Sequence, residues 1–205
     1  MKDQKDSRLL LFQDEGHLFV DPIGLFKEWF EHAKSAGEEV PEAMVLATAS
    51  KDYRVSSRVV LLKEIDCKGV MFFTNYESCK SQCLKENPFA SVTFLWKGLQ
   101  RQVCLRGKVE KVSLEISRKY FESRNRDSCI GAWSSLQSTP LSSREELEKR
   151  FEHFREKFAG LEKIPLPPHW GGYLLVVDYC EFWLQGDDRL HDRLCYSLEE
   201  KSWGK

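Results

Sequence analysis

Short apolar runs separated by turn-forming residues recur along most of the chain and predict β-strands. These runs are rich in Val, Ile, Phe and Thr, which favour strands. Gly, Asp, Asn and Ser at the breaks indicate turns, as at Asp66–Gly69. The predicted strands are Ala43–Ala49, Val55–Lys63, Val70–Thr74, Ala90–Trp96, Gln102–Val109, Tyr173–Val177, Cys180–Leu184 and Arg193–Leu198.

Four segments have the three-to-four-residue apolar spacing of helices, and each begins at a capping residue. They run from Asp21 to Gly37, from Ser78 to Asn87, from Ser113 to Arg124, and from Ser142 through the apolar stripe Leu147, Phe151, Phe154 and Phe158. The last has overlapping capping boxes, in which Ser142 pairs with Glu145 and Ser143 with Glu146. The polar residues 125–139 predict a loop.

The order of these elements predicts a mainly β protein with flanking helices. Because β-α-β alternation is absent, the pattern favours an antiparallel barrel over a parallel sheet. Residues 1–20 show no clear period and predict a mobile N-terminal arm, and residues 21–205 are expected to form a single domain. The sequence contains no internal repeat and no Gly-x-Gly-x-x-Gly or Walker loop that would indicate a nucleotide site of Rossmann or P-loop type.

Composition narrows the class of protein further. The 205 residues have 41% hydrophobic content and a formal net charge of −1, so we expect a globular core and no nucleic-acid partner. No apolar window approaches the roughly 20 residues of a membrane span, and the N-terminus lacks a signal-peptide core, which predicts a cytoplasmic protein without a membrane partner. The seven cysteines and five histidines show no metal-ligand spacing, so we expect reduced thiols and no metal.

Two cations, Arg58 and Lys63, lie at the ends of the apolar stretch Val59–Leu62. Charges that interrupt such a strand are costly unless they are paired or bind an anion, and a phosphate suits both cations. Because the two positions have opposite parity, an unbroken strand would send them to opposite faces. If both bind one ligand, a bulge or a strand end must lie between them. The alternative is two surface charges at strand ends.

A second candidate anion site combines Tyr120, Arg124 and Ser128. Tyr120 and Arg124 are about one helical turn apart and share a face of the predicted helix. A phosphate could therefore meet the phenol, the guanidinium and the hydroxyl of Ser128 together. The alternative is a helix end whose arginines bind terminal carbonyl groups.

A third concentration of chemistry runs from Glu181 to Arg193. It begins as an aromatic strand, breaks at Gly186 and then places Arg189, His191 and Arg193 close together. Such a strand and turn can hold an aromatic ring and several cationic donors around a small anionic ligand. The alternative is a solvated hairpin end in which neighbouring aspartates neutralise the arginines.

Taken in order, these motifs resemble the pyridoxine (pyridoxamine) 5′-phosphate oxidase family from Asp21 to about Trp203. Many spaced motifs in one order are far more specific than any single motif. The resemblance is carried by Arg58–Lys63, Phe73–Asn75, Gln100–Val103, Tyr120–Phe121 with Arg124, Arg126–Ser128, Ile130–Trp133, Gln137–Ser138, Trp170–Gly172 and Arg189–Arg193.

The resemblance implies a fold, a cofactor and a reaction. The implied fold is an FMN-binding split barrel that forms a homodimer, with FMN at the subunit interface. The implied reaction oxidises pyridoxamine 5′-phosphate and pyridoxine 5′-phosphate to pyridoxal 5′-phosphate. A hydride passes from the substrate C4′ to flavin N5, and O2 then reoxidises the flavin to give hydrogen peroxide. The flavin carries the chemistry, and the protein supplies alignment and charge.

The resemblance also implies roles for residues of this chain. Those implied to bind FMN are Arg58, Val59, Val60, Leu61, Leu62, Lys63, Phe73, Thr74, Lys80, Gln102, Gln137, Ser138, Trp183 and Arg193. Those implied to bind the substrate are Lys63, Tyr120, Arg124, Ser128, Arg189 and His191, and of these Arg189 and His191 are the implied catalytic residues.

The chain departs from the family pattern at several positions. Cys79 stands before Lys80 where the family usually has an arginine, so one phosphate-binding cation is absent. Asn125 replaces the usual proline, and Leu184–Gly186 replaces a Gln-Gly-Gly turn. These departures leave two alternatives open: a related split-barrel flavin oxidase with another substrate, and a non-catalytic protein that binds FMN or pyridoxal phosphate.

Overall fold

The computed structural model describes residues 21–199 and 202–204, so the predicted arm over residues 1–20 lies outside the described part. The strands are β1 (Ala43–Ala49), β2 (Val55–Leu61), β3 (Glu64–Asp66), β4 (Gly69–Asn75), β5 (Phe89–Trp96), β6 (Arg101–Lys111), β7 (Trp170–Leu184), β8 (Asp192–Glu199) and β9 (Ser202–Gly204). The helices are α2 (Pro22–Ser35), α3 (Cys79–Glu86), α4 (Leu114–Glu122), α5 (Arg126–Ser134) and α6 (Arg144–Lys157), with a 3-10 turn at Asp187–Arg189.

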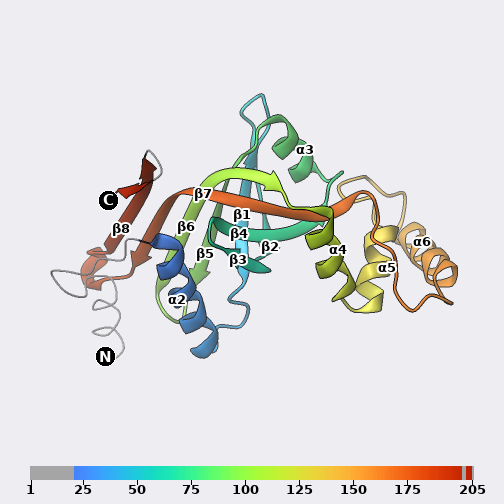
Figure 1. Ribbon diagram of the computed structural model, residues 1–205, viewed down its shortest axis with the longest axis horizontal. Helices are drawn as coiled ribbons and strands as arrows, with labels where there is room; N and C mark the ends of the chain where they lie inside the picture. The colour runs from blue at the N-terminus through green and yellow to red at the C-terminus, as the bar shows by residue number, and fades with distance from the viewer. Residues whose placement is uncertain (1–20, 200–201, 205) are drawn as a thin grey trace.

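The described strands form one antiparallel sheet, and this confirms the predicted fold class. The strand order is β2-β1-β5-β6-β7-β4-β3, while β8 pairs with β7 and β9 pairs with β8. The sheet curls until its edge strand β2 approaches β4 (Figure 1). The N–H of Lys63, just beyond β2, donates to the carbonyl of Met71 at 2.9 Å. The result is a barrel that stays split beside β2.

Strand β7 crosses most of the molecule (Figure 1). Its first half pairs with β4 and its second half with β8. The prediction of two separate strands here is wrong, because Asp178 does not end the strand. It is the extra residue of a bulge, since Arg106 pairs with Tyr179 and Gly107 with Val177. A Cβ on Gly107 would lie 1.9 Å from the carbonyl oxygen of Val176, so the bulge needs glycine there.

Helix α2 covers the inner face of the sheet and completes the main hydrophobic core. The Asp21 carboxylate accepts the N–H of Ile23 at 3.0 Å, as the predicted cap requires. Phe26 and Trp29 are buried, with ring centroids 5.0 Å from Phe94 and 5.2 Å from Phe182, respectively. The predicted first helix and its apolar face are confirmed.

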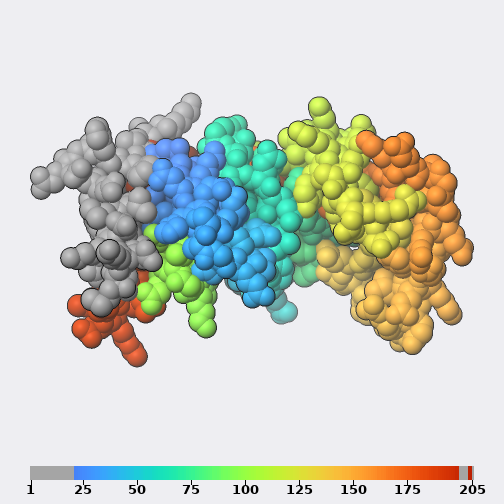
Figure 2. All heavy atoms as spheres, turned by 90° about the horizontal axis from the view of Figure 1, so that it is seen from below, coloured from blue at the N-terminus to red at the C-terminus, as the bar shows by residue number. Residues whose placement is uncertain are grey.

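Helices α4, α5 and α6 form a lobe at the end of the molecule opposite β8 (Figures 1 and 2). The prediction of a loop over residues 125–139 is wrong for residues 126–134. Asn125 caps α5 by accepting the N–H of Ser128 at 2.7 Å. Trp133 of α5 lies 5.6 Å from Phe154 and 5.4 Å from Phe158, between ring centroids, so the phenylalanine stripe of the last helix holds α5 in place.

The start of α6 also differs from the predicted capping boxes. Ser142 donates its N–H and its hydroxyl to Glu146, four positions on, at 3.1 and 2.7 Å. Ser143 is the N-cap residue but makes no side-chain cap hydrogen bond. In the described ranges, no helix has the length and apolarity to cross a membrane.

Candidate active site

The predicted phosphate-binding strand β2 ends at the split in the barrel, where a cavity of about 640 Å³ opens. After Leu61 the backbone changes partners: the N–H of Leu62 donates to Glu42, and the N–H of Lys63 donates to Met71. Leu62 turns into the core, at 4% exposure. Arg58 and Lys63 consequently line one cavity despite their opposite parity, so the strand end that the sequence required between them is present.

Arg58 is held on the cavity side of β2 by neutral acceptors. Its guanidinium donates to the hydroxyl of Thr48 at 2.8 Å, to the carbonyl of Leu46 at 3.2 Å and to the hydroxyl of Ser56. No carboxylate of the described residues pairs with it. The guanidinium is therefore oriented by the sheet while its charge stays available to an anion.

Lys80, in the first turn of α3, is a cation buried at 8% exposure. Its Nζ donates to Gln137 Oε1 at 2.9 Å, to Thr74 Oγ1 at 3.1 Å and to Ser78 Oγ at 3.1 Å. Burial, and secondarily the charge of Arg58, lowers the pKa of Lys80 to about 8. A buried amine with only neutral acceptors and a cationic neighbour is stabilised in its charged form by a bound anion.

Tyr120 and Arg124 extend from the end of α4 into the same cavity, and Ser128 reaches it from the first turn of α5. The Cζ of Arg124 lies 4.7 Å from the centroid of the Trp170 ring. Its Nη1 is buried and has no hydrogen-bond partner among the described residues. A buried donor without a partner is costly, and an anionic ligand is the natural way to satisfy the guanidinium.

The charge of the cavity is strongly one-sided. Four cations line it, namely Arg58, Lys63, Lys80 and Arg124, and no Asp or Glu is among the described lining residues. Neutral hydrogen-bonding groups complete the lining: Thr74, Asn75, Tyr120, Ser128, Ser135 and Gln137. A cavity of this size and sign suits anionic ligands that also carry a ring.

The loop after α5 is tied to the start of α3. Ser138 has a left-handed backbone (φ 68°), and its hydroxyl accepts the N–H of Cys79 at 3.2 Å. Ser138 and the exposed Cys79 stand beside Gln137 and Lys80, although neither of the two lines the cavity. The loop therefore positions Gln137 and Lys80 together.

A second group of predicted site residues lies away from this cavity and consists of Gln102, Trp183, Arg189, His191 and Arg193. Gln102, Trp183 and Arg193 are direct neighbours across β6, β7 and β8. The His191 ring centroid is 4.7 Å from that of Trp183, and its Nδ1 accepts the N–H of Gly186 at 3.2 Å. Figure 1 shows β8 and the α4–α5 region at opposite ends, so one chain does not bring the two groups together.

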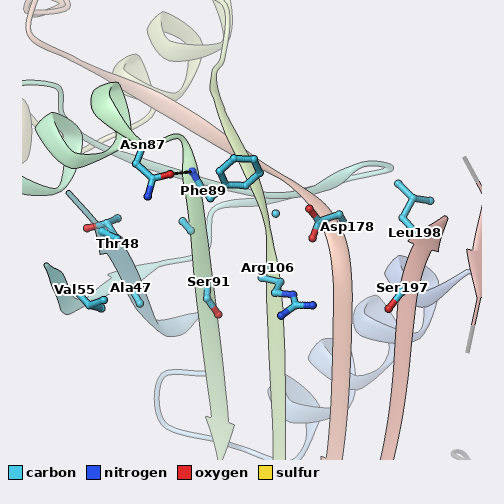
Figure 3. A pocket seen from close by; sticks show the side chains of 13 residues that line it. Ala47, Thr48, Val55, Asn87, Phe89, Ser91, Arg106, Asp178, Ser197 and Leu198 are labelled. Carbon is cyan, nitrogen blue, oxygen red and sulfur yellow. Dashed lines mark hydrogen bonds between the residues drawn. The ribbon is translucent and has the colours of Figure 1, made fainter. Parts of the chain in front are cut away.

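The outer face of the sheet, which carries Gln102 and Trp183, exposes several large apolar side chains among polar ones. Val45, Val59 and Leu95 are 43%, 64% and 64% exposed. A second cavity of about 620 Å³ lies on this face, and Figure 3 shows side chains of β1, β5, β6, β7 and β8 around it, including Arg106 and Asp178. Exposed apolar side chains mixed with polar ones on one face are typical of a subunit interface.

The cavity also contains residues that the sequence did not assign to it: Asn75, Gly131, Ala132, Ser135 and Trp170. Asn75 and Trp170 belong to quoted motifs, and their place beside Thr74 and Gly171 was a usable signal. Gly131 and Ala132 also belong to a quoted motif, although their segment was predicted to be a loop. Helix α5 turns these two residues toward the cavity, and Ser135 lines it from the C-cap position just after the helix.

Comparison with protein families gives two adjacent matches. A family model described as pyridoxamine 5′-phosphate oxidase matches residues 31–158. A second, described as the pyridoxine 5′-phosphate oxidase C-terminal dimerisation region, matches residues 170–205. The second match covers β7, β8 and the residues Arg189 and His191.

Curated relatives and solved structures agree with these matches. Proteins named pyridoxine/pyridoxamine 5′-phosphate oxidase from Psychromonas ingrahamii and Myxococcus xanthus are 50% and 48% identical to this chain. Each alignment covers 89% of this chain, with 84% and 88% of the respective relative. The crystal structure of PhzG from Burkholderia lata 383, in complex with tetrahydrophenazine-1-carboxylic acid, has a TM-score of 0.86 and 33% identity over 90% of each chain.

The curled antiparallel sheet, with a cation-lined cavity at its split, defines a protein of the split-barrel fold that flavin-binding relatives share. Together the two family models cover most of the described chain, and the relatives are about half identical in sequence. The chain belongs to the pyridoxamine 5′-phosphate oxidase family. The resemblance predicted from the motifs is confirmed.

Proposed function

We propose that this protein uses bound FMN to oxidise pyridoxamine 5′-phosphate and pyridoxine 5′-phosphate to pyridoxal 5′-phosphate, with O2 reduced to hydrogen peroxide. The observation that carries the proposal is the lining of the cavity, four cations without a carboxylate among the described residues. A cofactor and a substrate that each bear a phosphate need such a surplus of positive charge. The names of the relatives at about 50% identity support the same reaction.

The residues at the β2 end of the cavity fit the FMN phosphate. Lys80 and Arg58 are cations whose described partners are all neutral, and Thr74 adds a hydroxyl beside Lys80. Gln137 accepts a hydrogen bond from the Lys80 amine through its Oε1, and its side-chain NH2 group can donate to the flavin. Bound FMN supplies a ring that accepts a hydride, and the protein's part is to hold that ring and exclude water.

The residues at the helical end fit the substrate phosphate. Arg124, Tyr120 and Ser128 offer a guanidinium, a phenol and a hydroxyl, and Lys63 adds an ammonium from the end of β2. Their role is to fix the substrate by its phosphate so that its reacting carbon faces the flavin.

A second copy of the chain completes the site in this proposal. A two-fold axis pairs the same surface on both copies, and the outer face of the sheet, with its exposed Val45, Val59 and Leu95, is suited to that contact. Arg189 of the partner subunit and His191 of the partner subunit then face the cavity of the first chain. The match of residues 170–205 to a dimerisation region supports this arrangement.

The hydrogen bond from the Gly186 N–H determines the tautomer of the neutral His191 ring. The backbone N–H needs a lone pair on Nδ1, so the neutral imidazole carries its proton on Nε2. His191 therefore presents its Nε2–H as a hydrogen-bond donor to a bound ligand, and its ring is also packed on Trp183.

The test is turnover by the purified, FMN-loaded protein. With pyridoxamine 5′-phosphate it should produce hydrogen peroxide and the aldehyde in equal amounts, and the flavin absorbance should bleach when the substrate is added without oxygen. If FMN is bound and neither bleaching nor turnover occurs, the proposed function is wrong and a non-catalytic binding role takes its place.

A flavin oxidase with another substrate is the second candidate, and the similarity to PhzG favours it. The two candidates differ in their need for phosphate. Under the first, pyridoxamine should be oxidised far less efficiently than pyridoxamine 5′-phosphate, because Arg124, Tyr120 and Ser128 would have no ligand. Equal kcat/KM for the two compounds would favour the second candidate.

A further inference from the structure

Arg124 borders two cavities that differ in their charges. One is the cavity of the candidate site, whose described lining has cations and no carboxylate. The other, of about 170 Å³, has the carboxylates Glu122 and Glu162 in its lining, together with the cations Arg124, Arg126 and Lys163. Glu122 already pairs with Lys163 at 2.7 Å, and no ion pair joins Arg124 to a carboxylate among the described residues. Something other than charge therefore keeps this arginine at the candidate site.

Aromatic rings contact the guanidinium instead. Its Cζ lies 4.7 Å from the Trp170 ring centroid and 5.5 Å from that of Phe121. Trp170 is 8% exposed, is the first residue of β7 and contacts Phe121 edge-on at 5.1 Å. A guanidinium over an indole face gains electrostatic attraction, and its plane is fixed by the ring beneath it.

Trp170 is itself held by a stack of rings in the cavity wall. The Phe73 ring stacks against Trp170 and Tyr120, with centroids 5.6 Å and 4.0 Å away and interplanar angles of 16° and 23°, and the Tyr120 and Trp170 centroids are 6.1 Å apart. Gly172, two residues after Trp170, leaves room for the Phe73 ring, because a Cβ on Gly172 would lie 2.7 Å from that ring. The Trp-Gly-Gly motif thus places an aromatic face under Arg124 and beside Tyr120.

We infer that Trp170 is a positioning residue that holds Arg124 toward the substrate phosphate and away from Glu122 and Glu162. This inference rests on the proposed function for the identity of the ligand. Through Arg124, Trp170 contributes to the selectivity for phosphorylated over unphosphorylated substrates. Trp170 itself does not contact the reacting atoms.

The test is a double-mutant cycle on the FMN-loaded protein with Trp170→Leu, Arg124→Met and the two combined. Binding of pyridoxal 5′-phosphate by calorimetry and steady-state oxidation of pyridoxamine 5′-phosphate are both measured. Trp170→Leu should raise Kd and KM about tenfold, the factor equivalent to a strong cation–π contact, with kcat changed by less than about twofold. In the Arg124→Met background, which removes the cation, the same substitution should add less than about twofold, because its effect passes through the guanidinium.

Two further variants separate positioning from packing. Trp170→Phe keeps an aromatic face and should recover most of the affinity. Trp96→Leu removes a buried tryptophan of the main core that contacts Phe26 and Phe94 and does not line the cavity, and should leave Kd unchanged. Trp170→Met, whose longer and unbranched side chain adapts better to an irregular gap, serves in the cycle if Trp170→Leu does not fold.

The inference is overturned by a tenfold loss that persists in the Arg124→Met background, by a fall in kcat at constant KM, or by an equal loss in Trp96→Leu. Because calorimetry needs no turnover, the result is independent of the enzymatic proposal. A wild-type protein that binds pyridoxal 5′-phosphate without oxidising the amine would refute the proposed reaction and leave the Trp170 cycle decisive.

Discussion

Lys80 shows how position changes a single side chain. Its amine is buried beside Arg58, and its pKa falls from 10.5 to about 8, chiefly because burial disfavours the charge. A bound phosphate would restore the charged form. The affinity of the β2 end of the cavity for FMN should therefore depend on pH in a range where an ordinary lysine would not titrate.

We predict that the Kd for FMN rises between pH 7 and pH 9.5, because the ligand-free protein loses the Lys80 proton as the pH passes about 8. Fluorescence quenching of FMN measures this directly. Lys80→Met should bind more weakly at pH 7 and show a much flatter pH profile. An equally steep profile in Lys80→Met would assign the titration to another group.

The lowered pKa of Lys80 also affects stability. As the pH rises, the affinity for FMN should fall, whereas the free energy of unfolding of the ligand-free protein should increase. Between about pH 8 and 10.5 the unfolded chain holds the Lys80 proton and the folded, ligand-free protein does not. This group therefore adds to the free energy of unfolding as the pH rises through that range. Lys80→Met should lack the contribution in urea denaturation of the FMN-free protein.

Cys79 is the second residue whose identity matters, because it precedes Lys80 and its N–H is tied to Ser138. An arginine at this exposed position would add a charge-assisted hydrogen bond worth about 1.5–3 kcal/mol. We predict that Cys79→Arg tightens FMN roughly ten- to a hundredfold. Cys67→Arg, at an exposed cysteine in the β3–β4 turn, is the matched control and should change nothing; an unchanged Kd in Cys79→Arg would show that the site is already complete.

Among the helices and strands, those whose bounds depend on local residue patterns could be predicted from the sequence. The cap at Asp21, the bounds of β1 and the meander that follows were all available from periodicity and turn residues. Helix α5 was not, because Gly131 and the serines around it lower its helix propensity and its buried face is short. Its stability comes from α6, where Phe154 and Phe158 pack on Trp133, and contacts between helices are invisible to a local pattern.

The bulge in β7 is a similar case. Asp178 interrupts the apolar run, and sequence alone cannot tell a strand break from an extra residue that the partner strand accommodates. Gly107 on β6 makes the extra residue possible, because without a Cβ it lets the carbonyl of Val176 approach closely. The pairing of two residues about 70 positions apart is tertiary information.

The N-cap of α5 also positions Ser128, whose N–H it binds at 2.7 Å. We predict that Asn125→Ala lowers the free energy of unfolding by about 1 kcal/mol in urea denaturation, the usual cost of a lost cap. It should also raise KM for pyridoxamine 5′-phosphate, because the first turn of α5 carries the Ser128 hydroxyl. Asn125→Asp keeps the acceptor and should behave like the wild type. If Asn125→Ala proves as stable as Asn125→Asp, the cap contributes nothing.

At the scale of the whole molecule, the predicted site residues divide into two groups. The cavity at the split barrel gathers Arg58, Lys63, Lys80 and Arg124, while Arg189 and His191 lie near the far end of β7. Family motifs indicated that all six residues belong to one site. Neither periodicity nor spacing could show that a single chain keeps the groups apart, because that depends on the length and course of β7.

In the proposed dimer, each site takes Arg124 from one chain and Arg189 from the other. Arg124→Ala and Arg189→Ala proteins, each nearly inactive alone, are co-expressed with different tags, and the mixed dimer is purified. We predict that one of the two sites in the mixed dimer is wild type, so the mixed dimer should recover about half of the wild-type turnover. If both residues act within one chain, every site in the mixed dimer carries a defect, and the absence of any recovery would show that the site is not shared between subunits.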